Sequence, residues 1–358
     1  MRDTLSDSPH RPRLSDHTVT KRVIILALMG ILIGTGGAFG AIVLLHLIAL
    51  MTNLFWYQQF SFVEHVMPGN AGALHIIAAP VLGSLIIGVM ARFGSEKIRG
   101  HGIPEAIEAI LYSESRMSPK VAVLKPLSSA VSIGSGGPFG AEGPIIMTGG
   151  AIGSLFAQLF HLSAAERKTL LVAGAAAGMT AIFNAPIAAV LLALEVLLFE
   201  WKPRSFIPVV SAVLVSWCWR NALIGTGAIF PFYWMSQLQP MQLIIAVGIG
   251  ALTGLIAVAL SKSLYRLEEW FHHLPVHWMW WPALGSVIVG LGGIIQPRVL
   301  GAGYASIQSL LDGTLAINII ISLLLVKSIV WLVSLSSGTS GGVTLTRNPA
   351  PFRNRIPA

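Results

Sequence analysis

The stretch Gly134-Ser-Gly-Gly-Pro-Phe-Gly-Ala-Glu-Gly-Pro-Ile145 places a single carboxylate, Glu142, among glycines and prolines between two apolar segments. At membrane depth a charge costs about 3 kcal/mol or more unless it is compensated, so an intramembrane glutamate indicates a functional site. The glycines allow backbone that exposes amide N–H groups, and Pro144 is suited to be the first residue of the helix that follows. Because a helix N-terminus favours anions, we expect Glu142 and a small anion to compete for these amides. A packing turn with a structural glutamate is the alternative.

Composition indicates a polytopic membrane protein. Of 358 residues, 54% are hydrophobic and 11% charged, whereas charged residues make up about a quarter of soluble domains. The formal charge of +8 comes from Lys and Arg in short loops, as at the cytoplasmic face of membrane proteins, so nucleic acid is not an expected partner. No Ser-His-Asp arrangement, phosphate loop or zinc-protease motif appears, and we expect no enzyme, cofactor or metal site.

Charge and hydropathy also predict the topology. Residues 1–22 are polar and basic and precede an apolar run, 23–51, that is too long for a signal peptide. The N-terminus is therefore expected in the cytoplasm and the protein in the plasma or inner membrane. Further crossings are expected within residues 74–90, 206–219, 247–260 and 282–295, and residues 317–335 form another apolar run.

The middle of the chain, residues 121–198, has short apolar segments broken by Gly and Pro. A bilayer tolerates broken helices where they line a pathway enclosed by protein, which is typical of transporters and channels. The turn Gly100-His-Gly-Ile-Pro104 has a counterpart in Gly301-Ala-Gly-Tyr304. We therefore predict an all-α membrane protein with an inverted repeat of broken and tilted helices. The predicted parts are a cytoplasmic segment 1–22, a first repeat 23–205, a partial second repeat 206–343 and a tail 344–358.

Four motifs in this order resemble the CLC family of chloride channels and chloride/proton antiporters. Gly100-His-Gly-Ile-Pro-Glu105 is similar to the family's Gly-Ser-Gly-Ile-Pro-Glu, and Gly140-Ala-Glu-Gly-Pro144 to its Gly-Arg-Glu-Gly-Pro. Phe183-Asn-Ala-Pro186 and the run Ser336-Ser-Gly-Thr-Ser-Gly-Gly-Val343 resemble later parts of the family pattern. The resemblance covers roughly residues 21–343.

The resemblance implies that Glu142 gates chloride passage. Ionised, it would occupy the outer anion site, and protonated, it would swing away, which links proton and anion occupancy. The implied partners are chloride or a related anion, the lipid bilayer and a second copy of the chain in a homodimer. The residues implied to line the anion path are Gly100, His101, Gly102, Ile103, Pro104, Gly140, Gly143, Pro144, Ile145, Gly342 and Val343.

His101 stands where the family commonly has a serine that coordinates the central anion. Imidazole titrates near pH 6.5 when unperturbed, so one hypothesis is an anion ligand that strengthens as pH falls. The alternative is that backbone amides coordinate the anion and His101 faces the inner vestibule. Chloride and nitrate both stay open as the preferred anion.

The inner proton entrance also departs from the family. Alignment from Phe183 places Glu195 on the first, and Val196 on the second, of two positions where antiporters often carry glutamates. A passive channel and an antiporter therefore both stay open. We expect Glu195 to be a structural carboxylate near Lys202 and Arg204, with a place in a proton pathway as the alternative.

The last fifteen residues, 344–358, have three prolines and three arginines and no apolar period. The family continues at this point into another anion-lining turn and further helices. We expect this tail to be frameshifted or unstructured, the second repeat to be incomplete and the homodimer to be in doubt. A nonfunctional, truncated remnant with little or no flux is thus an alternative to a channel or antiporter.

Overall fold

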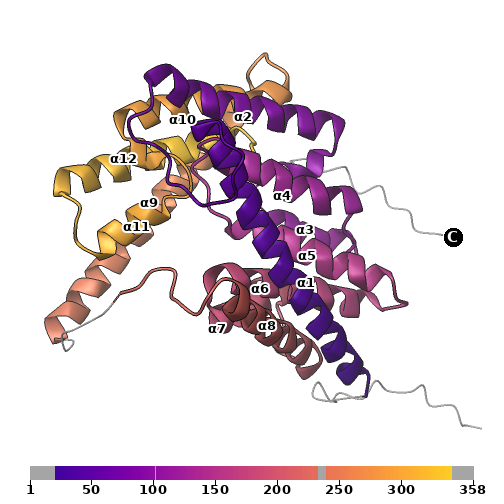
Figure 1. The fold of residues 1–358 in the computed structure, drawn as a ribbon. Helices are drawn as coiled ribbons and strands as arrows, with labels where there is room; N and C mark the ends of the chain where they lie inside the picture. Colours follow the sequence, from indigo (N-terminus) through magenta and orange to yellow (C-terminus); the bar gives the residue numbers. More distant parts are fainter. Residues whose placement is uncertain (1–20, 101, 233–238, 341–358) are drawn as a thin grey trace, which may run out of the picture.

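The computed structural model describes residues 21–100, 102–232 and 239–340, which are mostly helical (Figure 1). His101, Gly342, Val343 and residues 344–358, on which predictions were made, lie outside the described residues. The elements are α1 (Lys21–Thr52), η1 (Asn53–Tyr57), α2 (Ala73–Phe93), η2 (Glu96–Ile98), α3 (Ile103–Tyr112), α4 (Pro119–Gly134), α5 (Glu142–Gln158), α6 (Ala164–Phe183), α7 (Pro186–Leu192), η3 (Ala193–Leu198), α8 (Pro203–Leu223), α9 (Pro240–His272), η4 (Trp278–Trp280), α10 (Trp281–Ile295), η5 (Pro297–Val299), α11 (Tyr304–Leu311) and α12 (Ile317–Ser336).

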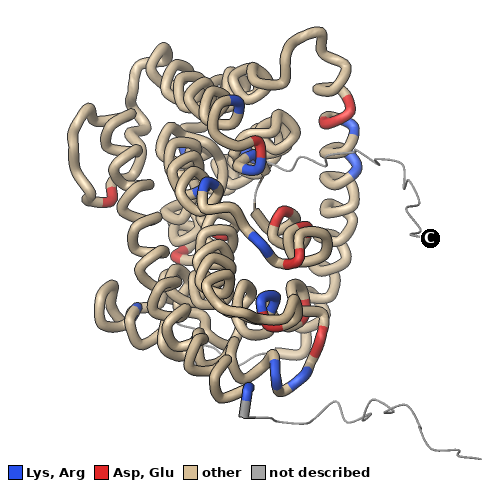
Figure 2. The backbone as a smooth tube through the Cα atoms, turned by 90° about the vertical axis from the view of Figure 1, so that its right-hand side faces the viewer, with Lys and Arg blue, Asp and Glu red and all other residues tan. Residues whose placement is uncertain are grey.

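Six segments in the described part of the chain are long and apolar enough to cross a membrane. They comprise α1 with η1, then α2, α8, α9, η4 with α10, and α12, and they coincide with the six apolar runs of the sequence. Figure 2 shows that long stretches of the backbone carry no Lys, Arg, Asp or Glu. The chain is therefore an integral membrane protein with all-α architecture.

The broken middle of the chain is closely packed and buried. The packing of α5 against α6 brings their backbones together, because a Cβ on Gly149 would collide with the Gly174 carbonyl and a Cβ on Gly174 with the Gly149 carbonyl. Small residues permit such close approach between helices in a membrane. The run Ala175–Ala177 of α6 is fully buried. This packing fixes α5, and with it the position of Glu142.

Helices α2, α3 and α4 recur as α10, α11 and α12, with the short η2 and η5 at equivalent places. The same contacts recur with them. Gly83 of α2 packs against the side chain of Ser135 and the carbonyl of Val131, and Gly285 of α10 packs against Ser337 and Val333 in the same way. The equivalent residues are separated by 202 positions, which confirms the predicted internal repeat.

Contacts between the two repeats are reciprocal. Gly88 of α2 packs against the backbone of Met279, just before α10, and Gly290 of α10 packs against the backbone of Ile77 in α2. Because each contact has a counterpart in which the repeats exchange roles, the repeats are related by an approximate two-fold axis.

Ser84 of α2 and Ser286 of α10 mark this axis. They are equivalent residues, both are buried, and their hydroxyls are hydrogen-bonded to each other. Helices α2 and α10 accordingly lie side by side (Figure 1). The predicted inverted-repeat fold is confirmed, whereas the domain limit at residue 205 stays a prediction, and α8 (Pro203–Leu223) runs across it.

Candidate functional site

Glu142 is the first residue of α5, with Ala141 as the N-cap. The expectation that Pro144 would open this helix was wrong, since the helix begins two residues earlier. The physical reason is that the first four N–H groups of a helix have no partner within it, so proline is tolerated at the third position as well as at the first. The shift places the carboxylate itself at the positive end of the helix dipole.

The side chain of Glu142 folds back over the preceding turn. A Cβ on Gly140 would collide with both carboxylate oxygens, so only glycine leaves room for this arrangement. Glu142 is exposed, while Ala141 and Gly143 on either side are buried. The carboxylate therefore occupies a position from which it can move without disturbing the packed backbone.

The N-termini of α3 and α5 meet at this point. Gly102 has a φ of 110°, and a Cβ there would collide with the backbone carbonyl of Gly143. Both the positive φ and the close approach require glycine. Within the described residues, the amides of Ile103, Glu142 and Gly143 donate no hydrogen bond to the protein. Two helix N-termini with free amides therefore point to one locality, which favours an anion.

Other amides of the expected anion path are already used. Gly102 donates its N–H to the Glu105 carboxylate at 2.7 Å, which caps α3. Ile145 donates its N–H to the carbonyl of Ala141 at 3.0 Å, and Pro104 and Pro144 have none. The N–H of Gly100 donates to the carbonyl of Thr339 at 3.2 Å. Fewer backbone N–H groups are thus free to bind an anion than the number of residues that the resemblance implies for the anion path.

A fully buried lysine lies behind the first turn. Lys125 of α4 is 0% exposed and donates its ammonium protons to the carbonyls of Ile98, at 2.8 Å, and Gly100. Its positive charge is the electrostatic complement of an anion near Gly102. Sequence reasoning missed this residue. The signal was a lysine inside an apolar helix, but its backbone partners lie 25 and 27 residues away.

The second repeat has an equivalent lysine. Lys327 of α12 donates to the carbonyls of Val299, at 3.2 Å, and Gly301, at 2.9 Å. These carbonyls stand in the turn before α11 where Ile98 and Gly100 stand before α3. Lys327 is thus the counterpart of Lys125 in the second repeat.

The second turn also reaches the candidate site. Tyr304, the first residue of α11, accepts a hydrogen bond on its hydroxyl from the N–H of Ala141, at 3.3 Å. Gly301 donates its N–H to the carbonyl of Gly136 at 3.1 Å. The glycine-rich stretch that precedes α5 is therefore held between the two equivalent turns, with Gly102 on one side and Tyr304 on the other.

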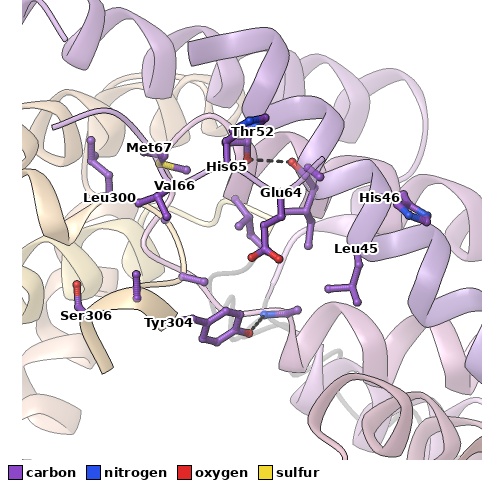
Figure 3. Close-up of a pocket in the computed structure, with 18 of the residues that line it drawn as sticks. Leu45, His46, Thr52, Glu64, His65, Val66, Met67, Leu300, Tyr304 and Ser306 are labelled. Atoms are coloured by element: carbon purple, nitrogen blue, oxygen red, sulfur yellow. Dashed lines mark hydrogen bonds between the residues drawn. The ribbon is translucent and has the colours of Figure 1, made fainter. Parts of the chain in front are cut away.

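A cavity of about 660 Å³ opens beside Ala141 and Tyr304 (Figure 3). Its walls come from α1, the loop between η1 and α2, the end of α8, and the turn that begins α11. The side chains with polar groups in this wall include His46, Glu64, His65, Arg298 and Tyr304. The cavity, named the outer pocket below, leads to the residue next to Glu142.

Glu195 lies elsewhere. It is an exposed residue of η3, which packs against α6, α7 and α8. Lys202 and Arg204 form ion pairs with Glu200, at 3.9 and 3.4 Å. Burial alone would raise the pKa of Glu200, but the hydrogen bond from Ser205 and the two cations together hold that pKa below its usual value. The basic loop thus has its carboxylate partner in Glu200.

The repeats related by a two-fold axis, the broken helices and the facing helix N-termini define a class of membrane transport protein. The family model for voltage gated chloride channels matches residues 82–345. The chain belongs to this family, as the resemblance implied.

Named relatives and solved structures agree. The voltage-gated ClC-type chloride channel ClcB of Shigella flexneri is 29% identical over 327 residues, which are 90% of this chain and 76% of the relative. ClcB of Shigella boydii serotype 18 is 30% identical with the same coverage.

Two solved structures share the fold. A slow cyanobacterial Cl⁻/H⁺ antiporter has a TM-score of 0.74 at 20% identity, over 91% of this chain and 76% of that protein. A CLC-type fluoride/proton antiporter has a TM-score of 0.76 at 18% identity, over 91% and 78%. At these identities the likeness concerns the fold alone.

Proposed function

We propose that the chain carries chloride or a similar small anion across a membrane, with Glu142 as a protonatable gate. The observation that carries this proposal is the meeting of two helix N-termini at Gly102 and Gly143, with Glu142 as the first residue of α5 and its carboxylate folded back over Gly140. The names of the relatives, which are chloride channels, support the choice of ion.

The gating follows from electrostatics. An ionised Glu142 supplies the negative charge that the free amides of α5 and the dipole favour, and so excludes an external anion from this place. Protonation removes that charge and frees the amides. Because the same site binds either a carboxylate or an anion, proton binding and anion binding promote each other.

The buried lysine supports the same proposal. The ammonium group of Lys125 donates to the Gly100 carbonyl and places a buried positive charge behind this turn. The carboxylate of Glu105 caps α3 and partly opposes this charge. The balance favours binding that is firm enough to select an anion and weak enough to release it.

Channel and antiporter remain the two forms of this function. Val196 stands where antiporters often have an acid. Glu195 is exposed on η3, and a place for it in a proton pathway is a separate proposal. His101 as a titrating anion ligand and the homodimer are further proposals that rest on the family resemblance. The location in a bacterial inner membrane, with the N-terminus in the cytoplasm, is also a proposal.

The experiment is flux through purified protein in liposomes. With an imposed chloride gradient, we expect chloride efflux, and proton uptake against its gradient if the chain is an antiporter. The Glu142→Gln variant should retain anion flux and lose both its pH dependence and any proton coupling. Glu269→Gln, an exposed acid on α9, is the matched control and should behave as the wild type. Absence of chloride flux from the folded wild type contradicts the proposal and favours the nonfunctional alternative.

A further inference from the structure

Tyr304 lies between Ala141, the neighbour of Glu142, and the outer pocket that Glu64 lines. Its hydroxyl accepts a hydrogen bond from the N–H of Ala141, and burial, together with the negative charges of Glu142 and Glu64, raises the pKa of Tyr304 to about 12. Glu142 is the first residue of α5. Glu64 extends from the loop between η1 and α2 into the outer pocket, toward the tyrosine ring (Figure 3).

The position of Tyr304 is fixed on both sides of the ring. Its backbone begins α11 directly after Gly303, which has a φ of 82° and lies against the ammonium of Lys327. Its ring contacts that of Phe230, with centroids 6.0 Å apart. The hydroxyl therefore stays beside Ala141, one residue from the gate.

The loop that carries Glu64 is also fixed. The amide nitrogen of Asn53 donates to the carbonyls of Ser61 and Val63, at 2.8 and 2.7 Å. The oxygen of the same side chain is 2.8 Å from Nδ1 of His65, which must be the donor because an amide oxygen only accepts. Glu64 is thus held between two anchored residues.

A phenol hydroxyl has one proton to donate. Since the hydroxyl of Tyr304 accepts from Ala141, its own proton is left to donate to a carboxylate. Glu142 is the residue after Ala141, and Glu64 lines the same pocket as Tyr304. A hydrogen bond donated to a carboxylate favours its ionised form, and a nearby negative charge disfavours it.

We propose that Tyr304 is a positioning residue for Glu142 and that Glu64, across the outer pocket, competes for the same hydroxyl proton. When Tyr304 donates to Glu142, the ionised gate is held in the anion site. When it donates to Glu64, the gate loses that support and protonates more readily. This inference rests on the proposed gating by Glu142 and adds an outer control on the pH at which the gate opens.

Other charged and titratable groups face the same pocket. His46 projects from α1, His65 from the same loop as Glu64, and Arg298 from η5, while Lys327 lies behind Gly303. All four are present in every variant compared below. Differences between variants therefore report on Tyr304 and Glu64.

The test is the pH profile of two measurements on the purified chain: chloride flux in liposomes, and chloride affinity by calorimetry in detergent. Tyr304→Phe removes the donor, so the midpoint should move to higher pH by about one unit, as for loss of one hydrogen bond to a charged group. Glu64→Gln removes the competitor and the repulsion, so the midpoint should move to lower pH by about half a unit. Tyr265→Phe and Glu269→Gln, both exposed on α9, are the controls and should leave it unchanged.

The double variant separates this role from general damage to the fold. If Glu64 acts through Tyr304, the Glu64→Gln shift should fall to less than half in the Tyr304→Phe background. Midpoints that stay at the wild-type value in both single variants, or shifts that simply add, overturn the proposal. If the wild type and Glu142→Gln have the same pH profile, the gating by Glu142 is itself wrong, and this inference fails with it.

Discussion

The turns before α3 and α11 have glycines of positive φ at equivalent places, Gly100 and Gly102 in the first and Gly301 and Gly303 in the second, and they differ in their surroundings. Each is backed by a lysine that donates to two carbonyls of the turn. The first turn is sealed, since Lys125 is fully buried and Gly102 packs on the backbone of Gly143. The second opens onto the outer pocket through Gly301, Gly303 and Tyr304.

Because of this difference, a repeated fold produces one functional site. The repeat supplies two turns of similar backbone, and the residue after the last glycine, Ile103 in the first and Tyr304 in the second, gives each turn a different role. The amide of Ile103 donates to no acceptor among the residues that the structure describes, whereas Tyr304 brings a hydroxyl to Ala141 in the second turn. In our account the first turn helps to bind the anion and the second controls the residue that competes with it.

The largest expected effect is the difference in unfolding free energy between Gly102→Ala in the first turn and Gly303→Ala in the second, each of which adds one methyl group. Gly102→Ala forces a Cβ into the Gly143 backbone at a φ of 110°, and should cost about 4 kcal/mol or prevent folding. Gly303→Ala meets mainly the flexible end of Lys327 at a φ of 82°, and should cost about 1 to 2 kcal/mol. Thermal unfolding in detergent measures both.

The control for this pair is Gly250→Ala on α9, where a Cβ meets nothing within 4 Å. Alanine there should be neutral or slightly stabilising, by up to about 1 kcal/mol. Equal midpoints for the Gly102 and Gly303 variants would refute the contrast between a sealed and an open turn.

The lysines should differ in their effect on anion binding. Lys125→Met removes a fully buried charge behind the first turn and should weaken chloride binding about tenfold, or ~1.4 kcal/mol. Lys327→Met removes a half-buried charge behind the second turn and should weaken it about threefold. Calorimetry measures the chloride affinities, with Lys120→Met, at an exposed lysine on α4, as the control. A larger loss of affinity in Lys327→Met than in Lys125→Met would contradict the prediction.

The two serines on the two-fold axis should lose equal unfolding free energy when substituted, unlike the glycines of the two turns. Ser84→Ala and Ser286→Ala each remove one partner of the same buried hydrogen bond and should each cost about 1 kcal/mol in unfolding free energy. The double variant should cost about as much as either single variant, because the bond is lost only once. Additive costs would show that the two hydroxyls have separate partners.

The smallest effect is expected far from both turns, at the ion pair between Arg22 of α1 and Glu166 of α6. The hydrogen bond from Arg22 holds the pKa of Glu166 below its usual value of 4.5. The pair therefore adds stability above about pH 4.5 that is lost as pH falls through the lower folded pKa.

Because Arg22 is largely exposed, Arg22→Ala should lower the thermal unfolding midpoint only slightly at pH 7. Unfolding measured from pH 7 down to pH 3 should show this difference shrink. A difference that grows toward low pH would contradict the assignment.

Sequence reasoning was effective where the signal is local. The six crossings follow from apolar length, and the position of Glu142 follows from the glycines and prolines around it. The start of α5 was missed because Pro144 is acceptable at either the first or the third position of a helix.

The parts that sequence could not give are contacts over long separations. The partner of Tyr304 is Ala141, 163 residues earlier, and no periodicity records such a pair. The capping of Gly102 by Glu105 is a local pattern that was present in the sequence, and it reduces the number of free amides. The anion-lining roles taken from the resemblance remain predictions.

The central claim is that Glu142 and an anion compete for one place at the N-terminus of α5. The most direct measurement is chloride affinity by calorimetry at pH 8 and pH 5, for the wild type and Glu142→Gln. The account predicts that wild-type affinity rises as pH falls, and that the variant binds equally tightly at both pH values. A wild type and a variant with the same pH dependence would contradict it.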